Sequence, residues 1–307
     1  MRLYIAGIGG MVGSALATEA HRQGIEVIGK SSQILDLTDR SLVFKELVEV
    51  KPDALIICAA KVGGIGANSK FPVDFLSMNL QIQTNLLDAA HFADINRVLF
   101  LGSSCIYPKF APQPIRESAL LTGLLEPTNE AYAIAKIAGL KLVQAYRQQF
   151  EREWISAMPT NLYGPKDNFD VRNAHVLPAL INRIDSGKRH GQSAITIWGD
   201  GSALREFLHV EDLARACLLL LREYNDDIPI NIGSGQEISI HNLAELVATI
   251  IGYEGQFEYD ANRPNGTPRK LLDSSLLSTK GWEPQISLQD GIASTYDWYL
   301  ENYKGVA

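Results

Sequence analysis

Apolar runs and helical segments alternate along the first half of the chain. The short apolar runs typical of buried strands are RLYIA, IEVIG, DALIICAA, RVLFLG and EWISAM. The segments between them carry apolar residues at helical spacing and predict helices at about 11–23, 40–50, 73–92 and 130–150. Buried strands separated by helices of this length require right-handed crossovers, so we expect a parallel sheet covered by helices on both faces.

The pattern changes after Pro159. Gly, Pro and Asn become frequent, and isolated strands such as AITIWG mix with helices such as HNLAELVATIIG. A further helix, LHVEDLARACLLLLREY, is followed by PINIG and could return the chain to the parallel sheet. The expected fold class is α/β, a Rossmann-type doubly wound parallel sheet with a smaller mixed α/β C-terminal substrate domain. The predicted boundaries are 1–163 with about 206–232 for the dinucleotide-binding domain, and about 164–205 with 233–307 for the substrate domain.

Glycines directly follow the first predicted strand. In AGIGGMVGSAL, Gly7, Gly10 and Gly13 have the spacing GxxGxxG at the start of a predicted helix. Such a turn lets the backbone approach a pyrophosphate, whose oxygens then face the free N–H groups of the helix N-terminus. The strand–turn–helix context therefore predicts dinucleotide binding here, with Met11 and Val12 as part of the turn.

The residues after the second predicted strand bear on the choice between NAD and NADP. A carboxylate there would accept a hydrogen bond from the ribose 2′-hydroxyl and repel a 2′-phosphate. The chain instead has GKSSQ, with Lys30, Ser31 and Ser32. Charge and hydrogen-bonding capacity therefore favour NADP. The alternative interpretation is a solvated loop that lacks an acidic residue by chance. Asp36, in ILDLTD, is a candidate for the adenine neighbourhood.

Tyr132 and Lys136, in EAYAIAKIAG, share one face of a predicted helix. A phenol of pKa about 10 is a poor acid–base group near neutrality, and a neighbouring ammonium lowers that pKa by stabilising the phenolate. Ser103 follows the predicted strand RVLFLG. Together with the glycine turn, these residues have the pattern of the extended short-chain dehydrogenase/reductases, with Ser103, Tyr132 and Lys136 as the catalytic triad.

Composition and charge narrow the class of protein. The 307 residues are 46% hydrophobic and 21% charged, as in an ordinary globular protein, and a net charge of −7 argues against a nucleic-acid-binding surface. Three cysteines without a CxxC pair favour a reducing compartment, and Cys58 and Cys217 lie in apolar runs that read as core. No apolar stretch approaches the length of a membrane span, and MRLYIAGIGG turns to glycine too early for a signal peptide. We therefore expect a cytoplasmic protein without a metal site.

The resemblance to known proteins extends beyond the superfamily. The chain is similar to the GDP-L-fucose synthase family in the segments GMVGSA, AAKVGGI, LGSSCIYPK, LEPTNEAYAIAKIAG, MPTNLYGPKDNF, REFLHVEDLA and NGTPRKLLD. This resemblance implies a bifunctional 3,5-epimerase and 4-reductase that converts GDP-4-keto-6-deoxy-D-mannose to GDP-L-fucose. The implied cofactor is NADP, with NADPH as the hydride donor.

The thiol of LGSSCIYPKF has a task in such a reaction. The C3 and C5 hydrogens of a 4-keto sugar are acidic because both carbons are α to the carbonyl, and inversion there needs an acid–base pair other than the tyrosine. A thiol of pKa about 8.5 and an imidazole both titrate near neutrality. The resemblance assigns this pair to Cys105 and His175. Without the resemblance, we would interpret Cys105 as a buried thiol at the end of a strand and His175 as a hydrogen-bonding residue at the start of a helix.

The resemblance also implies the residues around both ligands. Arginine forks suit a diphosphate and an indole offers an aromatic surface, and the implied GDP-sugar site consists of Arg183, Trp198, Arg205, Lys270 and Asp273. For Arg205, a salt bridge to Glu206 or Glu211 is the alternative reading. Besides the glycine turn, the triad and His175, the expected cofactor contacts are Lys30, Asp36, Leu37, Leu101, Gly102, Ser104, Pro159, Asn161 and Leu162.

Two departures from the family pattern concern the 2′-phosphate. The family often has an arginine inside the glycine loop and another beyond the second strand, where this chain has Gly9 and Ser32. Lys30 is the residue that could replace them. The alternative functions are an epimerase/reductase of the same family acting on another GDP-4-keto sugar (a 3,6-dideoxy hexose or a heptose), an NAD-dependent 4-epimerase, and a redox-sensing dinucleotide-binding regulator.

The helices predicted at 73–92 and 130–150 could pair with a second copy in a four-helix bundle, so we expect a homodimer. Their apolar residues could equally pack on their own sheet. Asn79 and Asn85 occupy polar positions of the first of these helices and either support the catalytic strand or face water. The other expected partner is the GDP-4-keto-6-deoxy-sugar substrate, and neither nucleic acid nor a membrane is expected.

Overall fold

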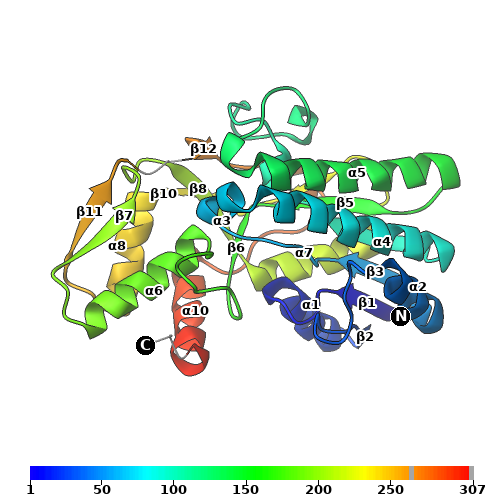
Figure 1. Ribbon diagram of the computed structural model, residues 1–307, viewed down its shortest axis with the longest axis horizontal. Helices are drawn as coiled ribbons and strands as arrows, with labels where there is room; N and C mark the ends of the chain where they lie inside the picture. Colours follow the sequence, from blue (N-terminus) through cyan, green and yellow to red (C-terminus); the bar gives the residue numbers. More distant parts are fainter. Residues whose placement is uncertain (263–265, 304–307) are drawn as a thin grey trace.

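A parallel sheet organises the first half of the chain and takes one strand from the second half. The computed structural model describes residues 1–262 and 266–303. Six strands lie in the order β2-β1-β3-β4-β5-β9, which confirms the Rossmann-type sheet and the return of PINIG as β9. Figure 1 labels β2, β1, β3 and β5 of this sheet. The bounds are β1 Arg2–Ala6, β2 Glu26–Ile28, β3 Ala54–Ile57, β4 Arg97–Leu101, β5 Ile155–Pro159 and β9 Ile230–Ile232. The order reverses between β1 and β3, and ligands of such sheets bind at the carboxyl ends beside the reversal.

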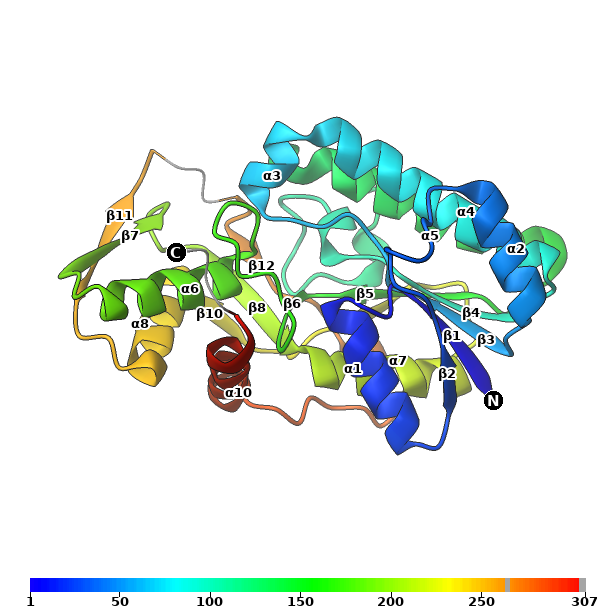
Figure 2. The ribbon, with the colours of Figure 1, turned by 60° about the horizontal axis from the view of Figure 1, so that its bottom comes forward.

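Helices cover both faces of this sheet, as expected (Figure 2). On one face lie α2 (Arg40–Val50), α4 (Asn79–Phe92) and α5 (Glu130–Phe150), and on the other lie α1 (Met11–Arg22) and α7 (Val210–Glu223). Within residues 1–262 and 266–303, no helix has both the length and the apolar character that crossing a bilayer requires.

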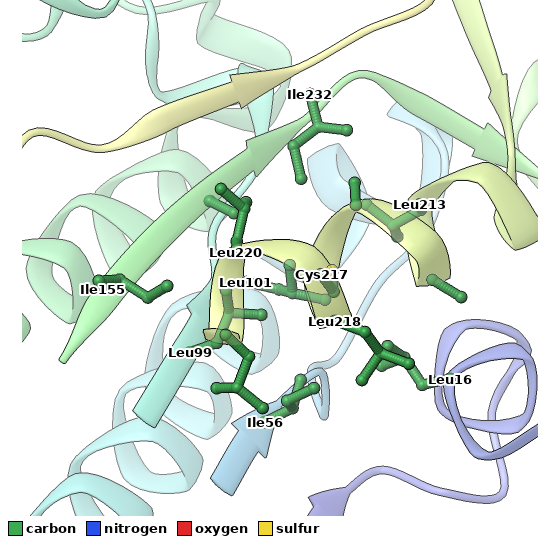
Figure 3. Packing of buried hydrophobic residues seen from close by; sticks show 14 of the residues in the cluster. Leu16, Ile56, Leu99, Leu101, Ile155, Leu213, Cys217, Leu218, Leu220 and Ile232 are labelled. Carbon is green, nitrogen blue, oxygen red and sulfur yellow. The ribbon is translucent and has the colours of Figure 1, made fainter. Parts of the chain in front are cut away.

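The core beneath α1 and α7 is purely apolar (Figure 3). Leu16 of α1 and Cys217 of α7 meet Ile56 and Leu99 of the sheet, and all four side chains are inaccessible to solvent. Cys58 packs against this cluster, and its thiol donates to Ala6 O at 3.0 Å. The interpretation of Cys217 and Cys58 as structural residues agrees with this packing.

The helix predicted at 73–92 is interrupted. Its first part is the π-helical turn η1 (Asp74–Met78), and α-helical geometry begins at Asn79. Asn79 Nδ2 donates to Phe75 O at 2.7 Å and to Lys61 O at 3.0 Å, and Lys61 N donates to Asn79 Oδ1 at 2.8 Å. A side chain that binds the preceding turn competes with the backbone ladder, which accounts for the wider turn. Asn79 is 2% exposed, so it supports the loop after β3 and does not face water.

The second half of the chain builds two smaller sheets, which confirms its mixed α/β character. One sheet has the order β10-β8-β12, with β6 paired to β8, and the other pairs β11 with β7. These strands are β6 Asn161–Tyr163, β7 Ala194–Trp198, β8 Leu204–His209, β10 Glu237–Ser239, β11 Gln256–Asp260 and β12 Arg269–Lys270. The remaining helices are α3 Ile65–Lys70, η2 Ser104–Ile106, η3 Glu117–Ala119, η4 Pro127–Asn129, α6 Val176–Arg189, α8 Ile240–Ile251, α9 Ser275–Ser278 and α10 Leu288–Asn302. A third apolar cluster joins α6, α8 and α10 to these strands.

A buried carboxylate links the two halves. Glu206 of β8 has 0% exposure, and its oxygens accept from Gly235 N at 2.7 Å and from Leu272 N at 3.1 Å. Among the described residues, neither Glu206 nor Glu211 forms the ion pair with Arg205 that was the alternative reading. Leu272 packs in the core of the six-stranded sheet, and the division of the chain into two domains stays a prediction.

We predict that Asn79→Ala lowers the free energy of unfolding by about 2 kcal/mol, because backbone groups of Lys61 and Phe75 lose their hydrogen-bond partner. Urea unfolding followed by circular dichroism measures the change. Gln81→Ala, on the exposed side of the same helix, is the control and should stay within about 0.5 kcal/mol of the parent. A loss at Asn79 no larger than at Gln81 would contradict the supporting role of the Asn79 side chain.

Candidate active site

The glycine turn after β1 forms a cradle for a phosphate. Gly7 has a φ of 95°, in the left-handed region that favours glycine. A Cβ on Gly13 would lie 2.1 Å from Gly7 O, so no side chain fits there. Gly10 N donates to Gly7 O at 3.0 Å, and Gly10 itself precedes α1 without a side chain that could cap it. A closed turn at a bare helix N-terminus fits the pyrophosphate of a dinucleotide.

The basic residue beyond β2 is paired. Lys30 Nζ forms an ion pair with the Glu46 carboxylate, which is buried and also accepts from Tyr4 Oη at 3.3 Å. Gly9 lies beside Ser31, and a Cβ on Gly9 would be 3.9 Å from the Ser31 Cβ, which leaves room for a side chain. Because Lys30 is paired with Glu46, only part of its positive charge is available to a 2′-phosphate.

The loop expected near the adenine is held from behind by Asn85. Asn85 is buried, and its Nδ2 donates to Leu37 O at 3.1 Å and to Thr38 O at 3.0 Å. Asp36 Oδ1 accepts from Thr38 Oγ1 at 2.7 Å and from Thr38 N at 2.9 Å, and these bonds lower the pKa of the exposed Asp36 carboxyl. Asn85 thus supports the loop and does not face water.

Ser103, Tyr132 and Lys136 come together at the carboxyl end of β4. Lys136 is 3% exposed, and its Nζ donates to Leu101 O at 2.8 Å and lies 5.9 Å from the centre of the Tyr132 ring. Burial lowers the pKa of Lys136 to about 8. Burial and the neighbouring Cys105 raise the pKa of the Tyr132 phenol, and its hydrogen bond with Ser103 acts in the opposite direction. The ammonium is therefore placed beside the phenol that it is predicted to activate.

Cys105 lies in η2, and its backbone N donates to Ser103 Oγ at 3.2 Å. Lys270 Nζ donates to the Cys105 Sγ at 3.4 Å, and Asn129 Nδ2 donates to the same sulfur at 3.2 Å. Burial alone would raise the pKa of the thiol. The charge of Lys270, the hydrogen bond with Ser103 and the charge of Arg205 outweigh burial, so the pKa of Cys105 falls below its ordinary value. The surroundings therefore favour a thiolate.

His175 is the N-cap of α6, but its side chain makes no capping hydrogen bond. The reading of His175 as a helix-start hydrogen-bonder therefore does not describe this geometry. The His175 side chain is exposed to solvent, but the loss of part of its hydration beside the protein and the charge of Lys270 lower the pKa of the imidazole, which favours a neutral ring. Lys270 of β12 acts on both residues predicted to move protons at carbon, Cys105 and His175.

The predicted sugar-diphosphate residues form two cationic groups. The Arg183 guanidinium stacks over the Trp198 ring, 5.0 Å from its centre, and Nη1 donates to Thr196 O at 3.3 Å. Trp198 is 44% exposed and borders, with Arg183, an open surface cavity of about 580 Å³. Arg205 and Lys270 stand opposite each other in the parallel pairing of β8 with β12. Both groups suit phosphate oxygens.

Asp273 is engaged in the fold around the end of β12. Its carboxylate accepts from Ser275 N at 3.0 Å and pairs with Arg116 Nε at 3.3 Å, and these contacts lower its pKa. Its backbone carbonyl accepts from Asn231 Nδ2 at 3.2 Å. The structure does not place Asp273 in the Arg183–Trp198 stack, and its contact with substrate stays a prediction.

The other predicted cofactor contacts lie at the ends of β4 and β5. A Cβ on Gly102 would be 2.4 Å from Met158 Sδ, so the backbone there has no room for a side chain. Asn161 Nδ2 donates to Glu206 O at 2.8 Å, which fixes its amide beside β8. Leu101 and Pro159 are the last residues of β4 and β5, Ser104 begins η2 after β4, and Leu162 lies in β6 after β5.

Sequence reasoning missed Asn129 and the contact of Lys270 with Cys105. Asn129 directly precedes α5, the helix of Tyr132, and an asparagine at that position is expected to cap the helix. The sequence therefore gives no sign of its hydrogen bond to the Cys105 thiol. Lys270 was predicted at the diphosphate. Its approach to the sulfur depends on the pairing of β12 with β8, for which a two-residue strand offers no sequence signal.

Comparisons with known proteins agree with this geometry. Residues 3–233 match the model of the NAD dependent epimerase/dehydratase family. The chain is 55% identical over 302 residues to GDP-L-fucose synthase 1 of Arabidopsis thaliana, which covers 98% of this chain and 94% of that protein. A solved GDP-L-fucose synthetase from Naegleria fowleri bound to NADP is 27% identical with a TM-score of 0.90, covering 98% of this chain and 94% of that one. A GDP-6-OMe-4-keto-L-xylo-heptose reductase from C. jejuni is 30% identical with a TM-score of 0.91, covering 98% and 97%.

We predict that Gly13→Ala weakens NADPH binding by at least about tenfold, because its Cβ would push Gly7 out of the phosphate cradle. The fluorescence of NADPH, titrated with protein, reports affinity without turnover. Gly9→Ala is the matched control, since a Cβ at that position makes only an ordinary van der Waals contact with the Ser31 Cβ at 3.9 Å and should leave the affinity unchanged. Equal affinities of the parent and Gly13→Ala would refute the cradle.

The buried ammonium of Lys136 predicts a pH dependence of stability. Its pKa is about 8 in the folded chain against the ordinary 10.5, so between these values the unfolded chain holds a proton that the folded chain has lost. The free energy of unfolding therefore gains up to about 3 kcal/mol from this group as pH rises through the window. Lys136→Met should lack that gain. Urea unfolding of both proteins from pH 7 to 10 isolates the difference, since the tyrosines titrate in both, and parallel curves would contradict the prediction.

Proposed function

The chain belongs to the NAD-dependent epimerase/dehydratase family, and we propose that it converts GDP-4-keto-6-deoxy-D-mannose to GDP-L-fucose, inverting C3 and C5 and reducing C4. The observation that supports this most directly is the convergence of Cys105, His175 and Lys270 on the Ser103–Tyr132 end of the triad. A reductase alone needs only the triad. A site that also holds a thiol beside an ammonium is equipped to move carbon-bound protons.

The triad performs the reduction of the ketone. NADPH supplies the hydride for C4 when it is bound. Tyr132 holds the proton for the C4 oxygen, and Ser103, which bonds to the same phenol, adds a second donor toward that oxygen. Lys136 is protonated below about pH 8 and stabilises the phenolate left after the proton is transferred. Its bond to Leu101 O keeps the ammonium on the strand end while the phenol changes charge.

Cys105 and His175 exchange the protons at C3 and C5. At each carbon one of the two groups removes the proton α to the carbonyl, and the other returns a proton to the opposite face. The thiolate that Lys270 stabilises can act as the base. The imidazole, once it has taken a proton from solvent, can act as the acid, and the proton left on the thiol exchanges with water afterwards. The negative charge that develops on the C4 oxygen in the enolate meets the Ser103 and Tyr132 donors. One binding site for the ketone oxygen therefore serves both half-reactions.

The cationic groups beyond the triad hold the nucleotide part of the substrate. The Arg183–Trp198 stack offers a fixed guanidinium and an exposed aromatic face, and Arg205 adds a second fork. Lys270 lies between Arg205 and Cys105, so its charge can serve the diphosphate and the thiol together.

Another GDP-4-keto sugar is the second candidate substrate. A solved relative is named for a heptose, and a 3,6-dideoxy hexose would permit inversion at C5 only. The 55% identity to a GDP-L-fucose synthase favours the fucose precursor. An NAD-dependent 4-epimerase needs only the tyrosine and a retained cofactor, so the Cys105–His175 pair argues against it. A redox-sensing regulator needs no catalytic triad, so the Tyr132–Lys136 pair argues against that function.

Assembly and location follow as proposals. Phe92 of α4 and Ile134 and Phe150 of α5 are exposed apolar residues, which supports pairing of these helices with a second copy in a homodimer. Cys58, Cys105 and Cys217 are all free, which supports a reducing compartment such as the cytoplasm. The net charge of −7 supports the absence of a nucleic-acid partner.

We predict that, with GDP-4-keto-6-deoxy-D-mannose and NADPH in deuterated water, the protein yields GDP-L-fucose labelled at C3 and C5. Cys105→Ser should lower label entry by at least about a hundredfold, the usual contribution of a general acid–base group. Mass spectrometry and NMR of the product measure both. Cofactor oxidation without label would leave a plain 4-reductase, and no oxidation would point to a different keto sugar. Full label entry with Cys105→Ser would remove the thiol from the mechanism.

A further inference from the structure

Asn129 occupies a helix-capping position without capping the helix. Asparagine is favoured at an N-cap because its side-chain oxygen accepts from the N–H groups of the first turn. At the start of α5 the Asn129 side chain makes no such bond. Its Nδ2 donates instead to the Cys105 Sγ at 3.2 Å, and its Oδ1 is buried with no hydrogen-bond partner among the residues that the structure describes.

We infer that Asn129 is a positioning residue that holds Cys105 as a thiolate, an inference that rests on the proposed epimerase function. A donor aimed at sulfur stabilises the charged form over the thiol. Lys270 approaches the same sulfur from β12, so an ammonium and an amide bind it from different elements. The amide adds a directed donor to the sulfur without adding net charge to the site.

The turn that carries Asn129 is tied to the segment that carries Cys105. Lys109 Nζ pairs with Glu126 Oε2 at 2.9 Å, and Lys109 N donates to Leu124 O at 2.9 Å. Glu126 O in turn accepts from Asn129 N at 3.1 Å. These bonds join the turn before α5 to the segment after η2, which keeps the Asn129 amide close to the Cys105 sulfur.

Among the residues that the structure describes, the other charged or titratable groups that act on the sulfur are Lys270 of β12, Arg205 of β8 and Tyr132 of α5. All three remain when Asn129 is replaced. A change in the reactivity of Cys105 in such a variant is therefore due to the amide.

Alkylation of the free enzyme by iodoacetamide tests the inference. The rate follows the thiolate fraction, and mass spectrometry of the Cys105 peptide reads it across pH. Asn129→Ala should slow alkylation by about tenfold on the acid limb of the profile and leave the plateau at high pH unchanged, since it removes one hydrogen bond to a charged acceptor. Asn129→Asp keeps the size but sets a carboxylate beside the sulfur, so it should slow the reaction further. Cys58 is an internal reference, because burial raises its pKa to about 12.

Ser287→Ala is the matched control. Ser287 caps α10, where its Oγ accepts from Asp290 N at 3.1 Å, and it takes no part in the thiol contacts. This variant should melt at a lower temperature with an unchanged alkylation profile, whereas Asn129→Ala should keep its melting temperature and lose reactivity. Unchanged profiles in both Asn129 variants, or a larger loss of melting temperature in Asn129→Ala than in Ser287→Ala, would overturn the inference.

Deuterium entry separates this inference from the proposed function. Slower alkylation together with slower label entry at C3 and C5 supports both. Slower alkylation with unchanged label entry keeps Asn129 as the residue that holds the thiolate and refutes the part of Cys105 in epimerisation.

Discussion

The buried carboxylate of Glu206 is the interaction on which the site depends. It lies in β8 and accepts hydrogen bonds from the backbone N–H groups of Gly235 and Leu272. β12 has only two residues, and its own ladder could not set its register. With Leu272 held, Lys270 comes to lie opposite Arg205 and over the thiol of Cys105. A carboxylate to which the proposed mechanism gives no chemical step thus helps to set the position of the Lys270 ammonium.

Burial and charge act in opposite directions on the acid–base groups. Burial lowers the pKa of Lys136 to about 8, so its side chain is still mostly an ammonium at neutral pH. Burial raises the pKa of Tyr132, so the phenol beside it is neutral. At Cys105 the balance is reversed, because Lys270 and Arg205 lie close enough to outweigh burial. The pKa values of two acidic groups in one site are thereby shifted in opposite directions, that of the phenol upward and that of the thiol downward.

Local patterns were enough to predict the elements that local chemistry determines. The helix at 40–50 was predicted with the bounds that α2 has, because Asp39 caps its start through Ser41 N and Leu42 N. The predicted 130–150 likewise matches α5. The glycine turn and the triad also follow from short spacings. The π-helical turn η1 could not be foreseen, because it depends on Asn79 reaching Lys61 across the preceding loop. The same limit applies to the active thiol, since Lys270 follows Cys105 by 165 positions in the chain.

The position of Lys270 between the thiol and the imidazole couples their titrations. Because one ammonium lowers both pKa values, a change in its own surroundings shifts Cys105 and His175 together. A diphosphate bound near Arg205 and Lys270 would offset part of that charge and raise both pKa values at once. The number of protons bound by Cys105 and His175 would therefore differ between the enzyme with a diphosphate bound and the free enzyme. Under the proposed mechanism, the pH dependence of kcat would report the thiol–imidazole pair in the complex and would belong to neither residue alone.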